Sequence, residues 1–301
     1  GVGMNGRLLI ASNRLPVTVR VEKGKAVVTP SAGGLATGLR GPHESGEGLW
    51  FGWPGSLASA KAEVRQQALA SLAAQRFVPI ELSDAEIDGY YNAFSNGVLW
   101  PVCHYLVDRL PLQTPDWEVY RRVNERFAEA IAARWQPGDV IWVHDFHLML
   151  LPALLRQRLP DARIGFFLHI PFPSSEVFRV LPWRAELLRG LLGADQIGFH
   201  TLAYLRHFAA ALLRQLGLEV EIDRVSVDGR DVRLTALPMG IDVQHFQALA
   251  ADPDLQAEAA AMRERGGSTR LVLGIDRLDY TKGIPRRLLA FERLLEKRAA
   301  D

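Results

Sequence analysis

Short apolar runs alternate with longer amphipathic segments over most of the chain. The apolar runs predict buried strands, and segments with apolar residues near i, i+3, i+4 and i+7 predict helices. The expected strands are 7–12, 49–53, 78–82, 140–143, 163–168, 196–199 and, after a break, 271–274. The expected helices are 60–75, 84–94, 117–135, 148–159, 202–216, 253–265 and 286–297, with helical segments across 175–191. Strands that alternate with helices indicate a parallel sheet covered on both faces.

Three segments depart from this alternation. Residues 17–21 and 25–29 flank a turn at 22–24 and predict a hairpin, and a short helix is expected to begin at 31–34. Residues 219–236 are β-prone, and 237–240 read as a boundary. We therefore expect an α/β chain with one nearly complete Rossmann-like domain over 1–240, a connector over 241–268, and the first βα unit of a second Rossmann-like domain over 269–301.

Composition narrows the class of protein. About half of the 301 residues are apolar, which is enough for a sizeable core, and a net charge of +1 argues against nucleic acid as the main partner. Cys103 is the single cysteine, so it forms no intrachain disulfide, and we expect it to be buried. No segment has the length of a membrane span and none resembles a signal peptide, so we expect a cytoplasmic protein without a membrane partner.

Polar side chains follow four of the expected strands. In a doubly wound sheet, ligands bind outside the carboxyl ends of the strands, so these side chains are candidates for one site. They are Asn13 and Arg14, then His144, Asp145 and His147, then His169, and finally His200 and Thr201. Arg14 together with Gly33 and Gly34 suits an anion, because glycines let the backbone approach a phosphate that an arginine binds bidentately. The alternative is a surface arginine beside a plain turn.

The loop 276–283 carries two cations between an apolar run and a helix. Backbone N–H groups and the positive end of the helix meet there, and Arg277 and Lys282 would add a fork and a point charge for phosphate oxygens. The alternative is a solvated turn in which these cations pair with Asp276 and Asp279.

Other polar and aromatic residues suit a sugar site better than a metal site or a serine nucleophile. Tyr91 and Trp100 stand among amides, a combination suited to sugars, although isolated aromatics are better explained as half-buried core positions with satisfied polar tips. His144, Asp145 and His147 fit no common zinc spacing, so we expect no metal, and the chain has no Gly-x-Ser-x-Gly elbow for a serine nucleophile. Asp145 suits sugar hydroxyls as an acceptor. His169 either faces a substrate or is a satisfied structural histidine.

Taken together, these segments resemble the trehalose-6-phosphate synthases, retaining glycosyltransferases of family 20 with the two Rossmann-like domains of the GT-B fold. The matching segments are 12–16 (SNRLP), 31–35 (SAGGL), 50–53 (WFGW), 90–96 (YYNAFSN), 99–101 (LWP), 142–147 (WVHDFH), 169–173 (HIPFP), 198–201 (GFHT), 238–242 (PMGID) and 276–283 (DRLDYTKG). They occur in family order and cover almost the whole chain.

The resemblance implies transfer of glucose from a nucleotide sugar, usually UDP-glucose, to glucose 6-phosphate, giving α,α-trehalose 6-phosphate. By position, Arg14 would hold the acceptor phosphate, and Tyr91, Trp100 and Asp145 would complete the acceptor pocket. Trp53 belongs to a matching segment at the substrate site. Gly34, with Gly33 before it, would lie against the donor phosphates, His169 would contact the donor glucose, and His200 stands near the donor where some relatives have glutamine.

The resemblance also implies the chemistry. Arg277 and Lys282 would bind the diphosphate and stabilise the charge on the leaving group, while the acceptor attacks from the face that the nucleotide leaves. Neither a metal nor another cofactor is expected. The family's second domain is longer than 269–301, so we expect the chain to act as a fragment with weak or no activity. Glucosylglycerol-phosphate synthase and a non-catalytic sugar-phosphate-binding lobe are the alternatives, and the nucleotide and a homo-oligomeric state stay open.

Overall fold

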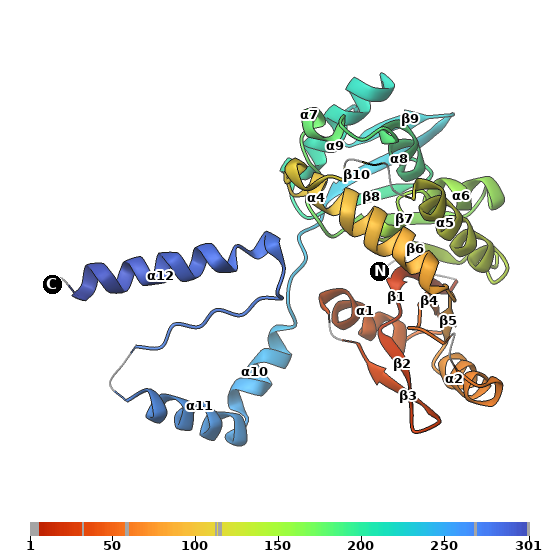
Figure 1. Ribbon diagram of the computed structural model, residues 1–301. Coiled ribbons are helices and arrows are strands. Elements are labelled where there is room, and N and C mark those ends of the chain that lie inside the picture. The colour runs from red at the N-terminus through yellow and green to blue at the C-terminus, as the bar shows by residue number, and fades with distance from the viewer. Residues whose placement is uncertain are drawn as a thin grey trace. The chain divides into compact units, whose positions relative to one another are not determined.

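The computed structural model describes residues 6–31, 33–57, 60–111, 113, 116–267 and 270–299, and it forms two compact units, Gly1–Gly240 and Ile241–Asp301. The first unit is built on an eight-stranded sheet in the order β5-β4-β1-β6-β7-β8-β10-β9 (Figure 1). Its strands are β1 (Leu8–Arg14), β4 (Leu49–Trp53), β5 (Phe77–Pro79), β6 (Val140–His144), β7 (Arg163–Leu168), β8 (Gln196–Phe199), β9 (Arg224–Val227) and β10 (Arg230–Ala236). All neighbouring strands pair in parallel except β9 and β10.

Helices connect the parallel strands, as the pattern predicts. They are α1 (Gly34–Glu44), α2 (Ala62–Ala74), α3 (Asp84–Glu86), α4 (Trp100–Cys103), α5 (Trp117–Ala132), α6 (Leu151–Arg158), α7 (Ser175–Phe178), α8 (Arg184–Leu191) and α9 (Leu202–Leu216). Shorter or irregular turns are η1 (Ile87–Leu99), η2 (Val107–Arg109) and η3 (Phe146–Leu148). The predicted hairpin is β2 (Val17–Glu22) paired with β3 (Lys25–Pro30).

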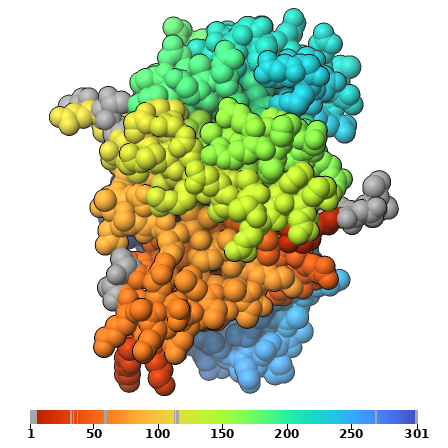
Figure 2. Space-filling view, turned by 90° about the vertical axis from the view of Figure 1, so that its right-hand side faces the viewer, coloured from red at the N-terminus to blue at the C-terminus, as the bar shows by residue number. Residues whose placement is uncertain are grey.

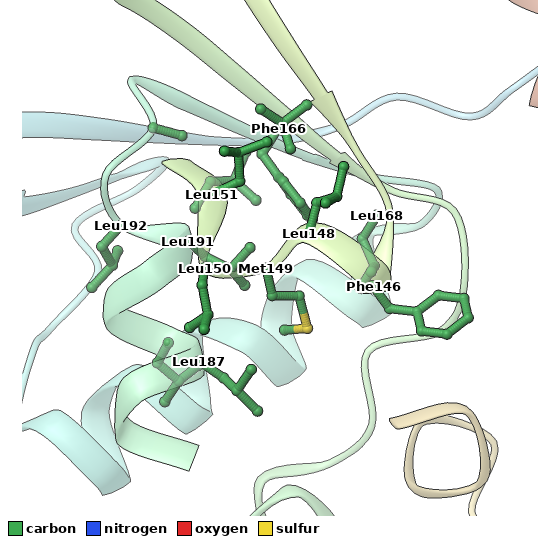
Figure 3. Packing of buried hydrophobic residues seen from close by; sticks show 14 of the residues in the cluster. Phe146, Leu148, Met149, Leu150, Leu151, Phe166, Leu168, Leu187, Leu191 and Leu192 are labelled. Atoms are coloured by element: carbon green, nitrogen blue, oxygen red, sulfur yellow. The ribbon is translucent and has the colours of Figure 1, made fainter. Parts of the chain in front are cut away.

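Strand β1 separates two apolar cores, because successive side chains of a strand point to opposite faces. Leu9 and Ala11 join the larger core under η1, α5, α6, α8 and α9, whereas Ile10 joins the smaller core of the hairpin, α1 and α2. In Figure 3 the turn after β6 packs Leu148 and Leu151 against Phe166 of β7 and leucines of α8. In Figure 2 the surface of the first unit changes colour along the chain, from the orange segment that contains α2 to the cyan segment that contains β9 and β10.

Several predicted boundaries need correction. The strand expected at 78–82 is only Phe77–Pro79, because its one neighbour, β4, ends at Trp53, and the last bond between them runs from the N–H of Ile80 to the carbonyl of Gly52. The helix expected at 84–94 is one turn, α3, followed by η1, a π-helical segment that runs on to Leu99. The helix expected at 148–159 is divided into η3 and α6.

The second unit contains helices but no sheet in its described residues. They are α10 (Val243–Ala251), α11 (Pro253–Gly266), the short turn η4 (Tyr280–Lys282) and α12 (Ile284–Ala299). Asp252 caps α11 by accepting from the backbone N–H groups of Asp254 and Leu255. The strand predicted at 271–274 is wrong for this structure: those residues are extended and exposed, since the described part of the unit offers no strand to pair with them. The division of this unit at residue 268 stays a prediction.

No helix in the described part of the chain is long and apolar enough to span a membrane.

Candidate active site

The sheet has its switch point between β1 and β6. From β1 the chain goes to β4 and β5 on one side, and then returns to build β6, β7 and β8 on the other. A crevice forms outside the carboxyl ends of two such strands, because their connections leave in opposite directions. Arg14 ends β1 and His144 ends β6, with Asp145 next in the chain. Since β1, β6, β7 and β8 are parallel, the four strand ends chosen from the sequence share this edge.

Three histidines lie in a row at the carboxyl ends of β6, β7 and β8: His144 is the last residue of β6, and His169 and His200 directly follow β7 and β8. The Nδ1 of His144 lies 2.9 Å from the Nε2 of His169, and the rings of His169 and His200 are 5.9 Å apart. Burial lowers the pKa of His144 well below its usual value, and His169 nearby lowers it further. Burial and the neighbouring His200 lower the pKa of His169 to about 4. Both rings are therefore neutral at pH 7.

Asp145 combines two unfavourable features. Its φ of 76° and ψ of 174° lie in a region that is almost exclusive to glycine. Burial raises the pKa of its carboxyl to about 7, although the backbone N–H groups of His169 and Phe146 stabilise the ionised form. One of these bonds, from His169 N–H to Asp145 Oδ1, measures 3.1 Å. Strain and a perturbed pKa at one residue at a strand end are typical of functional sites.

The loop that carries Asp145 is held by helix α5. The hydroxyl of Tyr120 donates to the carbonyl of Phe146 at 2.8 Å and accepts from the N–H of Met149 at 3.1 Å. One turn later, Asn124 donates to the carbonyl of His147 at 3.1 Å. Neither residue is among those predicted from the sequence. The sequence did contain a signal for them. Tyr120 and Asn124 lie four positions apart on the apolar face of the predicted helix, and buried polar side chains need hydrogen-bond partners.

Aromatic rings line the neighbouring segment. Tyr91, in η1, stacks on His147 with ring centroids 5.7 Å apart, and Trp100 contacts Phe146 at 5.6 Å. Burial, together with His169, lowers the pKa of His147 to about 3, so this ring is neutral as well. The structure thus brings Tyr91 and Trp100 to the loop that carries Asp145.

Arg14 is exposed at the end of β1, and its Cζ lies 4.7 Å from the centre of the Trp53 ring. Ser12 fixes the backbone there, because its buried hydroxyl donates to the carbonyl of Arg14 at 2.7 Å and accepts from Trp50 Nε1 at 2.8 Å. Arg14 and Trp53 are also partners in the β1–β4 register. The guanidinium is thus held over an aromatic face while its N–H groups remain available to an anion.

Gly33 and Gly34 begin helix α1. Gly33 is the N-cap, with a φ of 152° that disfavours other residues, and nothing lies within 4 Å of the position that a Cβ would take. Gly34 is the first helical residue. Ala32, in the middle of the quoted segment, lies outside the described residues.

Arg277 and Lys282 belong to the second unit, where both are exposed. Asp279 caps the turn η4 by accepting from the N–H of Thr281 at 2.9 Å, and Gly283 then takes the left-handed conformation before α12. Asp276 pairs with Arg287 of α12. That Arg277 and Lys282 act together with Arg14 or His169 stays a prediction.

The described part of the chain offers neither a metal site nor a cysteine nucleophile. It contains no group of three or more His, Cys, Asp or Glu side chains arranged to hold a metal ion. Cys103 is buried, as expected, and burial raises the pKa of its thiol, so it is not a nucleophile.

Comparisons with known proteins agree on one family. The family model described as glycosyltransferase family 20 matches residues 6–300. The chain is 43% identical to α,α-trehalose-phosphate synthase [UDP-forming] 1 of Aspergillus fumigatus over 292 residues, covering 95% of the chain and 56% of that protein. It is also 43% identical to α,α-trehalose-phosphate synthase [UDP-forming] A of Dictyostelium discoideum, covering 98% of the chain and 40% of that protein.

Solved structures show the same similarity. An E. coli structure described as trehalose-6-phosphate bound with UDP-2-fluoro glucose aligns with a TM-score of 0.81 and 35% identity, over 97% of this chain and 61% of that one. An α,α-trehalose-phosphate synthase (UDP-forming) from Burkholderia xenovorans in complex with glucose-6-phosphate aligns with a TM-score of 0.79 and 35% identity, over 98% and 63%. The chain thus spans about half the length of the relatives it matches.

Proposed function

Because the chain belongs to glycosyltransferase family 20, we propose that it is the acceptor-binding part of a trehalose-6-phosphate synthase with the GT-B fold. The reaction transfers glucose from a nucleotide sugar, UDP-glucose, to glucose 6-phosphate and gives α,α-trehalose 6-phosphate with retention. Relatives named as UDP-forming synthases and a neighbour in complex with glucose-6-phosphate support these substrates. A cytoplasmic location belongs to the same proposal.

In this proposal each strand end has one task. Arg14 binds the acceptor phosphate, and Asp145 accepts hydrogen bonds from the acceptor's hydroxyl groups beside Tyr91 and Trp100. His169 and His200 lie toward the donor, and His169 donates to a hydroxyl of its glucose. An acceptor sugar suits this position, because its hydroxyl groups donate hydrogen bonds to Asp145. A carboxylate that is costly to bury is stabilised most by such donors.

The chemical step needs no nucleophile from the protein. The acceptor oxygen bonds to the anomeric carbon as the bond from that carbon to the diphosphate breaks, and the acceptor's proton passes to the departing phosphate oxygen. Arg277 and Lys282 stabilise the charge that develops on the diphosphate. We propose no metal or other cofactor, since cationic side chains take that role.

One observation carries the proposal: a strained aspartate with a raised pKa lies at the switch point of the sheet, beside neutral histidines and an available arginine. Neutral histidines and aromatic faces suit a sugar, and the arginine suits a phosphate. A sugar phosphate suits both groups, because its ring can contact the histidines and aromatic faces while its phosphate binds the arginine.

Calorimetric titration of the chain with glucose 6-phosphate and with glucose tests the acceptor assignment. We expect glucose 6-phosphate to bind more tightly, and Arg14→Ala to weaken it by about 10- to 100-fold, since hydrogen bonds to charged groups contribute roughly 1.5–3 kcal/mol. The matched control is Arg163→Ala, which removes an exposed arginine that begins β7 at the opposite edge of the sheet. Equal binding of the two sugars, or equal loss in both variants, would refute the assignment.

A second candidate has one observation in its favour. The N-terminal domain of trehalose-6-phosphate phosphatase from Candida albicans aligns with a TM-score of 0.77 and 31% identity over 91% of this chain. The same fold thus occurs in a protein named for another activity, which suits a non-catalytic sugar-phosphate-binding lobe. Such a lobe would bind glucose 6-phosphate without acting on UDP-glucose.

A further inference from the structure

We infer that His144 is a positioning residue that holds His169 in the tautomer with its proton on Nδ1, so that His169 presents an N–H donor to its ligand. The inference deepens the proposed function, on which it rests for the identity of that ligand as a sugar hydroxyl. The proposed function gives roles to Asp145, His169 and His200, and this inference adds one for His144.

The contact between the two rings allows only one proton in the shared bond. His144 Nδ1 and His169 Nε2 are 2.9 Å apart, and both rings are neutral at pH 7, so one nitrogen donates and the other accepts. In a neutral imidazole the second nitrogen then has the opposite role. The direction of this single bond therefore fixes the hydrogen-bonding character of both outer nitrogens.

The surroundings of His144 decide the direction. Its Nε2 is buried and has no hydrogen-bond partner among the described residues. If His144 accepted from His169, that buried nitrogen would carry an N–H with no acceptor. Orphaned N–H groups are rarer in protein interiors than acceptors left without a donor. His144 therefore donates from Nδ1 and keeps only a lone pair at the buried Nε2.

The consequence falls on His169. Its Nε2 accepts from His144, so its proton is on Nδ1, which makes no hydrogen bond within the described residues and belongs to a half-buried ring. A ring N–H at that position donates to a hydroxyl oxygen, and it does so without the positive charge of an imidazolium. Strand register explains the arrangement, because β6 pairs with β7 in parallel and both histidines follow the same edge.

The tautomers can be observed directly in the chain labelled with ¹⁵N at histidine. Long-range ¹H–¹⁵N correlation spectra distinguish a protonated Nδ1 from a protonated Nε2, and loss of a signal in His169→Gln assigns the ring. Two other histidines supply internal references, since a carbonyl only accepts: His43 must donate from Nε2 to Gln75, and His207 from Nδ1 to Phe172. We expect His169 to show the His207 pattern.

Two variants at position 144 complete the test. His144→Asn keeps an N–H donor close to the position of Nδ1, so we expect His169 to retain its Nδ1 proton. His144→Leu removes the donor, and we expect the proton of His169 to move to Nε2 while His43 and His207 stay unchanged. A His169 protonated on Nε2 in the unaltered chain, or a tautomer indifferent to His144→Leu, would overturn the inference. The spectra need no ligand, so failure of the proposed function would not affect this result.

Discussion

Asp145 shows how one residue can carry costs that the rest of the fold offsets. Its backbone lies in a region that costs roughly 1–3 kcal/mol for a residue with a side chain, and its carboxyl loses hydration. Both costs persist because the neighbouring backbone fixes the residue: its N–H donates to the carbonyl of Phe167, and its carbonyl accepts from the N–H of Leu148. Asp145 therefore destabilises the fold, and its position is better explained by binding of a ligand.

We predict that Asp145→Asn stabilises the fold, and increasingly so between about pH 4 and pH 7. The pKa of Asp145 is about 7 in the folded chain and 3.8 as a reference, so the unfolded chain releases the proton first and stability falls as pH rises through this window. The loss is complete above pH 7 and amounts to a few kcal/mol at most, at about 1.4 kcal/mol for each pKa unit. Urea unfolding at pH 4, 5.5 and 8 measures it.

Asp145→Gly isolates the backbone cost when it is compared with Asp145→Ala. Both changes remove the carboxyl and its bonds to the N–H groups of His169 and Phe146, whereas only glycine relieves the backbone, so we expect glycine to be more stable than alanine by an amount that does not vary with pH. A gain from Asn that is the same at pH 4 and pH 8 would contradict the raised pKa, and equal stability of the glycine and alanine variants would contradict the strain. All three variants should lose binding of glucose 6-phosphate.

At the scale of elements, periodicity identified most of the first unit but not its irregular parts. The strands that begin at Leu49, Val140, Arg163 and Gln196 start where the pattern places them, because buried parallel strands are short continuous apolar runs. The π-helical segment η1 could not be predicted, since its hydrogen bonds join i and i+5 and leave no separate apolar period. The stacking of Tyr91 on His147 could not be predicted from the sequence for the same reason, since Tyr91 lies in η1.

The sequence likewise predicted some residues of the candidate site and not others. The sequence placed Arg14, Asp145, His169 and His200 at one edge, because the ends of parallel strands can be inferred from strand order alone. It could not supply the partners of those residues, which come from segments distant in the chain. Tyr120 of α5 is the clearest case, since its bonds to Phe146 and Met149 depend on how α5 lies across the sheet.

We therefore predict that Tyr120→Phe loosens the loop after β6. The change removes one donor and leaves the carbonyl of Phe146 and the N–H of Met149 without their partner, at a cost of about 1–3 kcal/mol. Urea unfolding gives that cost, and hydrogen exchange should show faster exchange in residues 146–149. Tyr204→Phe in α9 is the control, because its hydroxyl makes no hydrogen bond within the described part of the chain. Equal effects of the two changes would show that Tyr120 has no special role.

At the scale of the whole molecule, the apolar core belongs to the first unit. The buried apolar side chains run from Leu9 to Leu234, and none of the described residues from 241 to 298 is buried. In the second unit Leu271, Val272 and Leu273 are 61%, 72% and 84% exposed, although their sequence is that of an inner strand. Apolar residues become a strand only where another strand satisfies their backbone, so the sequence signal alone was insufficient there.

We predict that a chain ending at Gly240 unfolds in urea with nearly the same midpoint and the same slope as the chain of 301 residues. The midpoint follows the free energy of unfolding and the slope follows the surface exposed, and both depend on the core between Leu9 and Leu234. Hydrogen exchange provides an independent check, because amides of β1 and β6 should exchange only on global unfolding, whereas those of α12 should exchange by local opening. A large fall in the midpoint after removal of 241–301, or α12 amides as protected as those of β6, would mean that the second unit is part of the same cooperative structure. Binding of glucose 6-phosphate should also survive the removal, since Arg14, Tyr91 and Asp145 all lie in the first unit.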